Sequence, residues 1–484
     1  MKTKKLHQIA FTLITLFLLS ANLYSQVGIG TLNPDPSAML DLDSTTKGML
    51  APRMTSTERI SISNPANGLL VYDTSENAFY FYKSSTWTKL DSKTRNNHKL
   101  IKSEADLSDE LTAGGGSKYL LSSNSVYEIN GIINLTFPIE LNNAYLKGLH
   151  TNEDKLIKAS GDMFIGSKGG TIKNLTLAGG TIFNLTGSTS ESLIIRDSVI
   201  ANAASVGVID GYGIVFLSIV QFTGNASGIE YSDINNLLIS NTGWFSTNSG
   251  VYETYSGTFS SIEKQGGFMT INGEAKGIDL SNNPSVSKAV LSGVSFNGTS
   301  TEYVKKYSTG TYPDYSFNNS WTVDCPGIKV ETDQVASANI YYNGTITTGF
   351  VQTVTNGNAF NLTGNSGSNT TNDVNMFRSS SPQNNRITYL GNKTRTFKIS
   401  ASLSVRGNSG IGDYYAFFIR KNGSTSLIET NTLMRVNNTS DISSNAISGT
   451  VELGKNDYIE IWAQRLTGSG TTSITVFSLN LDIK

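Results

Sequence analysis

The sequence has little cysteine, histidine or charge for its 484 residues. There is one cysteine, Cys325, so no disulfide can form within the chain. With only three histidines, the sequence offers no His/Cys metal constellation, no Ser-His-Asp set and no nucleotide loop, and it predicts no cofactor. Charged residues make up 15%, the formal net charge is −1, and no basic patch stands out, which does not favour nucleic-acid binding. Low charge with abundant Gly, Ser, Thr and Asn is typical of a β-rich extracellular protein.

Long apolar runs are also scarce, and the one at the N-terminus has the pattern of a secretory signal. Lys2, Lys4 and Lys5 precede an apolar run over 11–19, and small and polar residues follow over 21–25. The alternative is a membrane anchor, but the run is shorter than the roughly 20 residues that a span needs. We therefore expect a signal peptide over residues 1–25, a secreted or cell-surface protein, and no integral membrane segment after cleavage.

An imperfect repeat occupies residues 169–299. Alternating apolar segments end in a small or turn residue at intervals of about 20–30 residues, which indicates a solenoid of strands. Each coil has too little apolar surface to fold alone, so stacked coils must build the core. The pattern predicts a solenoid over 118–335, with inward-pointing rows that include the following residues: Ile200, Phe222, Ile239, Ile271 and Phe296.

Coil length and pattern resemble the right-handed parallel β-helix of pectate lyases, phage tailspikes and many secreted surface proteins. The resemblance implies a fold and carries no catalytic motif.

Two short regions precede the predicted solenoid. Residues 26–92 begin with the string Val27-Gly28-Ile29-Gly30, and later alternating segments predict a small β meander over 68–90 that a trimer or a neighbouring domain completes. The opening string resembles a module that follows the signal peptide in secreted Bacteroidetes proteins and occurs in phage-tail-like proteins. Residues 93–117 are expected to be a linker with a short helix, which Ser103 and Asp106 cap.

Residues 336–484 have the alternating strands and Gly/Asn/Ser turns of an antiparallel sandwich. The segments 414–423 and 451–462 resemble the jelly-roll of C1q and tumour necrosis factor domains, and similar heads end phage tail fibres. The resemblance implies a homotrimer. The predicted fold class is thus all-β: a small N-terminal β module, a right-handed parallel β-helix solenoid and an antiparallel jelly-roll sandwich.

Four carboxylates recur about once per predicted coil: Asp210, Glu230, Glu253 and Asp279. Equivalent positions of stacked strands lie about 4.8 Å apart, and two carboxylates about 5–9.5 Å apart can hydrolyse a glycosidic bond. The alternative is a solvated edge where each carboxylate ends a strand. These residues are the candidates for catalysis, although non-catalytic function is preferred.

An aromatic group in the irregular part of the repeat is the candidate ligand site, because aromatic rings can stack on sugars: Trp244, Phe245, Tyr252 and Tyr255. Packing within a long loop is the alternative. Three functions remain open on these grounds. The first is a fibre-like, trimeric adhesion protein that binds glycans or cell surfaces without catalysis. The others are a tailspike-type polysaccharide depolymerase, either a glycoside hydrolase or a lyase, and a structural spacer.

Overall fold

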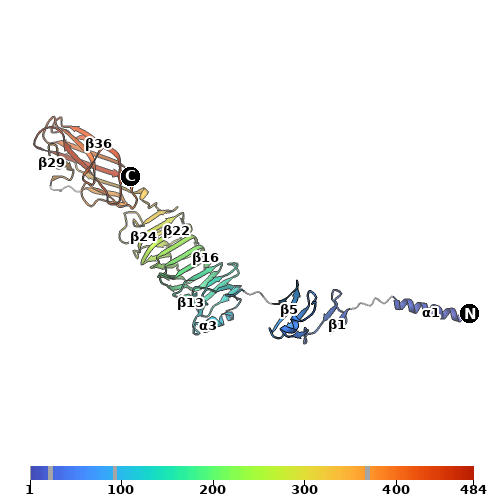
Figure 1. The fold of residues 1–484 in the computed structure, drawn as a ribbon. Helices are drawn as coiled ribbons and strands as arrows, with labels where there is room; N and C mark the ends of the chain where they lie inside the picture. Colours follow the sequence, from blue (N-terminus) through green and yellow to red (C-terminus); the bar gives the residue numbers. More distant parts are fainter. Residues whose placement is uncertain (1, 20–25, 91–94, 366–370) are drawn as a thin grey trace. The chain divides into compact units, whose positions relative to one another are not determined.

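A computed structural model of the chain describes residues 2–19, 26–90, 95–365 and 371–484 (Figure 1). The described residues are mainly β-strands, which confirms the predicted all-β class. The chain forms two compact units, Met1–Arg95 and Asn96–Lys484.

The first unit contains the N-terminal helix and two small sheets. Its elements are α1 (Lys2–Leu19), β1 (Val27–Ile29), β2 (Leu40–Leu42), β3 (Arg53–Met54), α2 (Ser56–Ile60), β4 (Leu70–Asp73), β5 (Ala78–Lys83) and β6 (Thr86–Lys89). Strands β4, β5 and β6 form the predicted meander, and β3 extends it in parallel. Buried Arg59 pairs with Asp73 at 2.8 Å and lies over the Tyr80 ring. No helix among the described residues is long and apolar enough to span a membrane.

The second unit begins with a parallel solenoid whose strands pair with those of neighbouring coils. The elements are β7 (His98–Ile101), η1 (Glu104–Leu107), α3 (Ser108–Ala113), β8 (Tyr119–Leu120), β9 (Val126–Ile129), β10 (Ile132–Asn134), β11 (Ile139–Glu140), β12 (Tyr145–Lys147), β13 (Lys155–Gly166), β14 (Gly170–Lys173), β15 (Thr176–Thr186), β16 (Ser192–Ala201), β17 (Ser205–Asp210), β18 (Ile214–Thr223), β19 (Ile229–Ser232), β20 (Asn236–Trp244), β21 (Val251–Ser256), β22 (Thr258–Thr270), β23 (Lys276–Asp279), β24 (Ser285–Ser292), β25 (Ser295–Asn297), β26 (Val304–Lys305) and β27 (Trp321–Asp324). The sheet starts at β7, which pairs with β9, so part of the expected linker at 93–117 belongs to the solenoid. The predicted cap is present at the start of η1: Ser103 is the N-cap residue, and Asp106 at the third position of η1 completes the capping box.

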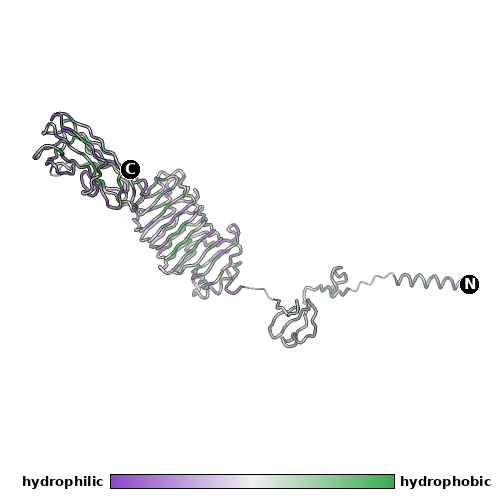
Figure 2. The backbone as a smooth tube through the Cα atoms, turned by 45° about the horizontal axis from the view of Figure 1, so that its top comes forward, coloured by the Kyte–Doolittle hydropathy of each residue, from purple (hydrophilic) through white to green (hydrophobic). Residues whose placement is uncertain are grey.

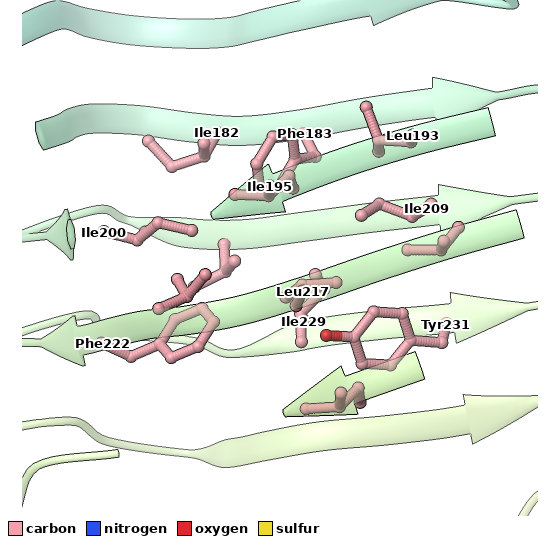
Figure 3. Packing of buried hydrophobic residues seen from close by; sticks show 14 of the residues in the cluster. Ile182, Phe183, Leu193, Ile195, Ile200, Ile209, Leu217, Phe222, Ile229 and Tyr231 are labelled. Atoms are coloured by element: carbon pink, nitrogen blue, oxygen red, sulfur yellow. The ribbon is translucent and has the colours of Figure 1, made fainter. Parts of the chain in front are cut away.

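Apolar side chains fill the solenoid in rows that run from coil to coil (Figure 3). One row consists of Leu156, Leu177, Ile200, Phe222, Trp244, Met269 and Phe296. The five residues that the sequence predicts to point inward are all buried, with 3% or less of their surface exposed. Apolar and polar residues alternate along the coils because only every second side chain of a strand faces the core (Figure 2).

One corner of the coils needs a left-handed backbone. Asn174, Asp197, Asn241 and Gly266 have φ between 52° and 67° there. These residue types adopt this conformation at little cost. Ile219 occupies the same corner with φ 55°, although it is β-branched and half exposed.

The remaining residues form an antiparallel sandwich. Its elements are η2 (Asp333–Val335), β28 (Ser337–Asn343), β29 (Phe350–Thr355), β30 (Ala359–Asn361), β31 (Asn372–Phe377), β32 (Ser379–Ser380), β33 (Ile387–Tyr389), β34 (Arg395–Gly407), β35 (Tyr414–Lys421), β36 (Thr425–Arg435), β37 (Ser443–Leu453), β38 (Tyr458–Arg465) and β39 (Thr471–Ile483). One sheet has the order β31-β28-β39-β34-β37 and the other β32-β33-β38-β35-β36. This is the predicted jelly-roll, with a separate apolar core between its sheets.

A buried arginine of the sandwich closes the end of the solenoid. The Arg378 guanidinium donates hydrogen bonds to the backbone carbonyls of Asn318, Trp321 and Glu331, and it lies 3.3 Å from Asp333. These carbonyls belong to the last coil and the segment after it, where no further coil follows to donate hydrogen bonds to them. The solenoid and the sandwich are therefore joined by charge-assisted hydrogen bonds.

Candidate functional site

The four candidate catalytic carboxylates do not form a column. Asp210 pairs in register with Ser232, not with Glu230. Glu230 aligns with Thr254, and Thr254 with Asp279, so Glu230 and Asp279 are two coils apart, or about 10 Å at the spacing of stacked strands. The number of residues between each carboxylate and its preceding glycine differs, and every added residue shifts the side chain to the other face.

Glu253 lies inside the solenoid, in an inner row whose neighbouring positions are apolar. Its neighbours in register are Ile229 and Ile278. Lys264 lies likewise in another inner row, between Ile239 and Leu291. The two side chains meet across the core, with Nζ and Oε1 2.9 Å apart and both buried.

Aromatic donors complete the hydrogen bonding of the Glu253 carboxylate. Trp244 Nε1 donates to Oε1 at 2.9 Å, and the Tyr255 hydroxyl donates to Oε2 at 2.8 Å. Burial, together with the charge of Glu253, raises the pKa of Tyr255 well above its ordinary value, so the hydroxyl keeps its proton. Because both charges are paired and hydrogen-bonded, the core can hold them. A polysaccharide cannot reach the buried Glu253 carboxylate.

Of the other three carboxylates, Asp279 is buried, whereas Glu230 and Asp210 are half-buried. Asp279 pairs with Lys305 at 3.0 Å, and Glu230 accepts a hydrogen bond from Ser256 at 2.8 Å. Asp210 is half buried at the end of β17. No two of the four candidates occupy equivalent positions in adjacent coils, so none of them has another as its neighbour in register.

The aromatic candidates are mostly core residues. Trp244 is stacked between Phe222, at 3.9 Å between ring centroids, and Tyr252, at 5.0 Å. Tyr255 is also buried. Only Phe245 is exposed, at 38%, and its ring packs edge-on against Phe268. Three of the four rings have no face open to a sugar, because the coils are wide enough to enclose them.

A different apolar group lies in the open. We define the assembly surface as residues 27–50, which contain the parallel pair β1–β2. Its large apolar side chains are 42% to 99% exposed: Val27, Ile29, Leu32, Met39, Leu40, Leu42, Met49 and Leu50. A two-stranded sheet is marginal in water on its own, and a concentration of exposed apolar side chains marks an interaction site.

The assembly surface is hollowed over β1–β2. A groove of about 860 Å³ is lined by Ile29, Leu40, Leu42 and Met49 together with the polar segment 43–48. Among the described residues no segment of the chain fills it. The sequence signal for this surface was the alternation Val27-Gly28-Ile29 and Leu40-Asp41-Leu42, but the prediction placed the incomplete sheet downstream, at 68–90.

Comparison with known families places one match on this region. Residues 28–103 match a family model described as a phage tail like trimerisation region. The match includes most of the assembly surface and the meander. A search of curated proteins finds no match to the chain.

Solved structures resemble a limited part of the chain. Murine APRIL at pH 8.5 is 10% identical over 29% of this chain and 98% of its own, with a TM-score of 0.18. Eiger TNF from S. frugiperda is 10% identical over 31% and 92%, with a TM-score of 0.20. PRD1 vertex protein P5 is 12% identical over 31% and 96%, with a TM-score of 0.19. Likeness at this level says nothing about what the chain binds.

Proposed function

We propose that the protein is a secreted, fibre-like homotrimer that binds glycans or cell surfaces without catalysis, and that the assembly surface joins its three chains. The observation that carries the proposal is the set of exposed apolar side chains in residues 27–50, inside the segment that matches a trimerisation region. Each such side chain contributes about 1.5–3 kcal/mol when it is fully buried. Copies of this chain are the occupants that the family match favours.

The sequence of the N-terminus supports secretion. A basic start, an apolar run and small residues before Gln26 are the features of a cleaved signal. We expect the protein in the culture medium or on the cell surface to begin at Gln26 or Val27, which N-terminal sequencing measures. A protein that retains Lys2 to Lys5 in those fractions contradicts this part of the proposal.

The arrangement of the carboxylates supports a role without glycoside cleavage. Glu253 is paired with Lys264 in the core, Asp279 is buried and paired with Lys305, and no two candidates are neighbours in register. Hydrolysis needs an acid and a second carboxylate that flank one bond. The solenoid then serves as the stiff shaft of a fibre, with the sandwich as its head.

The oligomeric mass tests the assembly surface. Light scattering of the secreted protein is expected to give the mass of three chains. The double variant Leu40→Asp/Leu42→Asp is expected to give the mass of one chain, because burying unpaired carboxylates in an apolar interface is unfavourable. Leu149→Asp is the control, since Leu149 is also an exposed leucine but belongs to the solenoid.

The three measurements separate the possible outcomes. Trimers for the wild type and the control with monomers for the double variant support the proposal. A monomeric wild type, or a double variant that stays trimeric, overturns the role of residues 27–50 in assembly.

A further inference from the structure

Two adjoining cavities lie where the last coil of the solenoid meets the sandwich. One, of about 440 Å³, extends over residues 300–306 and 314–316, and it continues to 327–329. The other, of about 390 Å³, lies against residues 313–315 and 373–376. Because both are lined by Asp314, Tyr315 and Lys329, we treat them as one groove, the junction groove. Each half is large enough for a small-molecule ligand.

The wall that the two halves share is rigid. The Tyr315 ring stacks on Phe377 of the sandwich, with centroids 3.9 Å apart and planes 16° apart. The Lys329 ammonium lies over the same Tyr315 ring, 4.4 Å from its centroid. Ser316, next in the chain, is fixed by its backbone N–H, which donates to the buried Glu331 carboxylate at 2.7 Å. A wall held in this way loses little conformational entropy when a ligand binds.

Polar groups around this rigid wall remain unpaired. Among the described residues, the side chains of Asp314, Asp373 and Lys306 make no hydrogen bond or ion pair, and all three line the groove. By contrast, Glu302, at the rim, is engaged with Lys276 at 3.1 Å. Two free carboxylates and a free ammonium are therefore available to a ligand from both halves.

The mixture of groups selects the chemistry of the ligand. Three carboxylates and two ammonium groups line the groove, so its charge is mixed. A phosphate-rich ligand needs a mainly positive surface and a polycation a mainly negative one, and the groove offers neither. Carboxylates accept hydrogen bonds and ammonium groups donate them, which suits a ligand whose hydroxyl groups do both. Tyr303 adds an aromatic ring to the wall of the larger half.

We propose that the junction groove binds a neutral oligosaccharide, with sugar hydroxyls donating to Asp314 and Asp373 and accepting from Lys306 and Lys329. The inference rests on the proposed glycan-binding function and gives it a location. It is independent of the assembly surface, because the residues that line the groove lie within 300–376.

Binding to immobilised neutral tetrasaccharides tests the groove. The probes are maltotetraose, cellotetraose, laminaritetraose and mannotetraose, and the protein is the full secreted chain. Asp314→Asn/Asp373→Asn removes both free carboxylates while keeping their size, and Asn tolerates the left-handed backbone of residue 314 (φ 64°). Val374→Trp fills the smaller half from an exposed position on β31. The matched controls are Glu452→Gln and Ile428→Trp, which change exposed residues outside the groove.

We expect the wild type and both controls to bind at least one tetrasaccharide, and both groove variants to bind it at least tenfold more weakly with an unchanged oligomeric mass. Equal binding by wild type and groove variants overturns the groove while leaving the glycan-binding function in place. A wild-type protein that binds none of the four probes overturns the proposal that the groove binds neutral oligosaccharides. The measurement of oligomeric mass tests the proposed trimer separately.

Discussion

The assembly surface and the solenoid core use the same residue types in opposite ways. In the solenoid, Leu, Ile and Phe side chains at alternate positions of β16, β18 and β20 are buried by the coils on either side. In residues 27–50, similar side chains of β1 and β2 are exposed. The difference lies in what each strand stacks on. Every inner coil has two neighbours from its own chain, whereas β1 and β2 have only each other.

This contrast explains why the solenoid core is complete within one chain, whereas the assembly surface needs a partner to cover it. Stacked coils build a continuous core from units that are too small to be stable singly. Residues 27–50 contain enough apolar side chains for a core but lack the layers to cover it. Other copies of the chain supply such layers in a symmetric assembly.

A charge in the solenoid core is expected to have the largest effect. Phe222→Asp places a carboxylate among Ile200, Trp244 and other fully buried side chains, and it should lower the free energy of unfolding by about 4 kcal/mol or more. The measurement is urea unfolding followed by circular dichroism. Ile214→Asp, on the same strand but exposed, is the control and should change stability by less than about 1 kcal/mol. Similar losses for both variants would mean that the rows are assigned to the wrong face.

The buried ion pair gives the next largest effect. Lys264→Met leaves the Glu253 carboxylate without its cation in the core, which should cost about 3–5 kcal/mol in urea unfolding. The double variant Lys264→Met/Glu253→Leu should recover part of that loss, because no unpaired charge remains in the core, although the Trp244 N–H and the Tyr255 O–H lose their acceptor. The surface pair Lys276–Glu302 is the reference, and Lys276→Met should cost at most about 1 kcal/mol. A double variant as unstable as the single one would contradict this account.

Sequence reasoning found the apolar rows but not this pair. The strands 414–421 and 458–465, and the five inward residues, follow from alternation, which is a local signal. The pairing of Glu253 with Lys264 depends on the register between coils, because each residue alone resembles an exposed charge on a strand. The predicted carboxylate column was wrong for the same reason, because the register between coils places its members at different positions.

A buried carboxylate at the solenoid end should make stability depend on pH. Burial raises the pKa of Glu331 to about 7 from 4.5, although the N–H groups of Ser316 and Phe317 and the charges of Arg378 and Lys329 oppose the shift. The folded state thus holds the proton more tightly than the unfolded state. The stability contribution is present below pH 4.5 and is lost as pH rises through about 7, by up to about 3 kcal/mol.

Glu331→Gln isolates this contribution. The wild-type free energy of unfolding, measured against the variant at each pH, should fall between pH 4.5 and 7 and level off above. Parallel pH profiles for the two proteins would exclude Glu331 as the titrating group.

The smallest expected effect is a gain in stability at the left-handed corner. Ile219→Asn replaces a strained β-branched residue by the type that occupies the same corner at Asn241. The strain at φ 55° is about 1–2 kcal/mol, and Ile219 is half exposed, so the net gain should be about 1 kcal/mol in urea unfolding. The reverse change, Asn241→Ile, should destabilise by a similar amount. A loss of stability in Ile219→Asn would show that the isoleucine contributes more by packing than it costs in strain.

The incorrect predictions from the sequence have a common physical cause. Strand β7 lies in a charged stretch, and its membership of the solenoid depends on pairing with β9, about one coil further on. Trp244, Tyr252 and Tyr255 resemble an exposed aromatic loop until the width of the coil is known. Long-range pairing decides these cases, and the junction groove also forms from segments far apart in the chain.

Hydrogen exchange of residues 27–50 tests the central comparison most directly. If copies of the chain cover the assembly surface, the backbone amides of β1 and β2 in the wild-type protein should exchange at least a hundredfold more slowly than in Leu40→Asp/Leu42→Asp, with the solenoid amides unchanged. Rapid exchange of β1 and β2 in the wild type, equal to that in the variant, would contradict the claim that this surface is an interface.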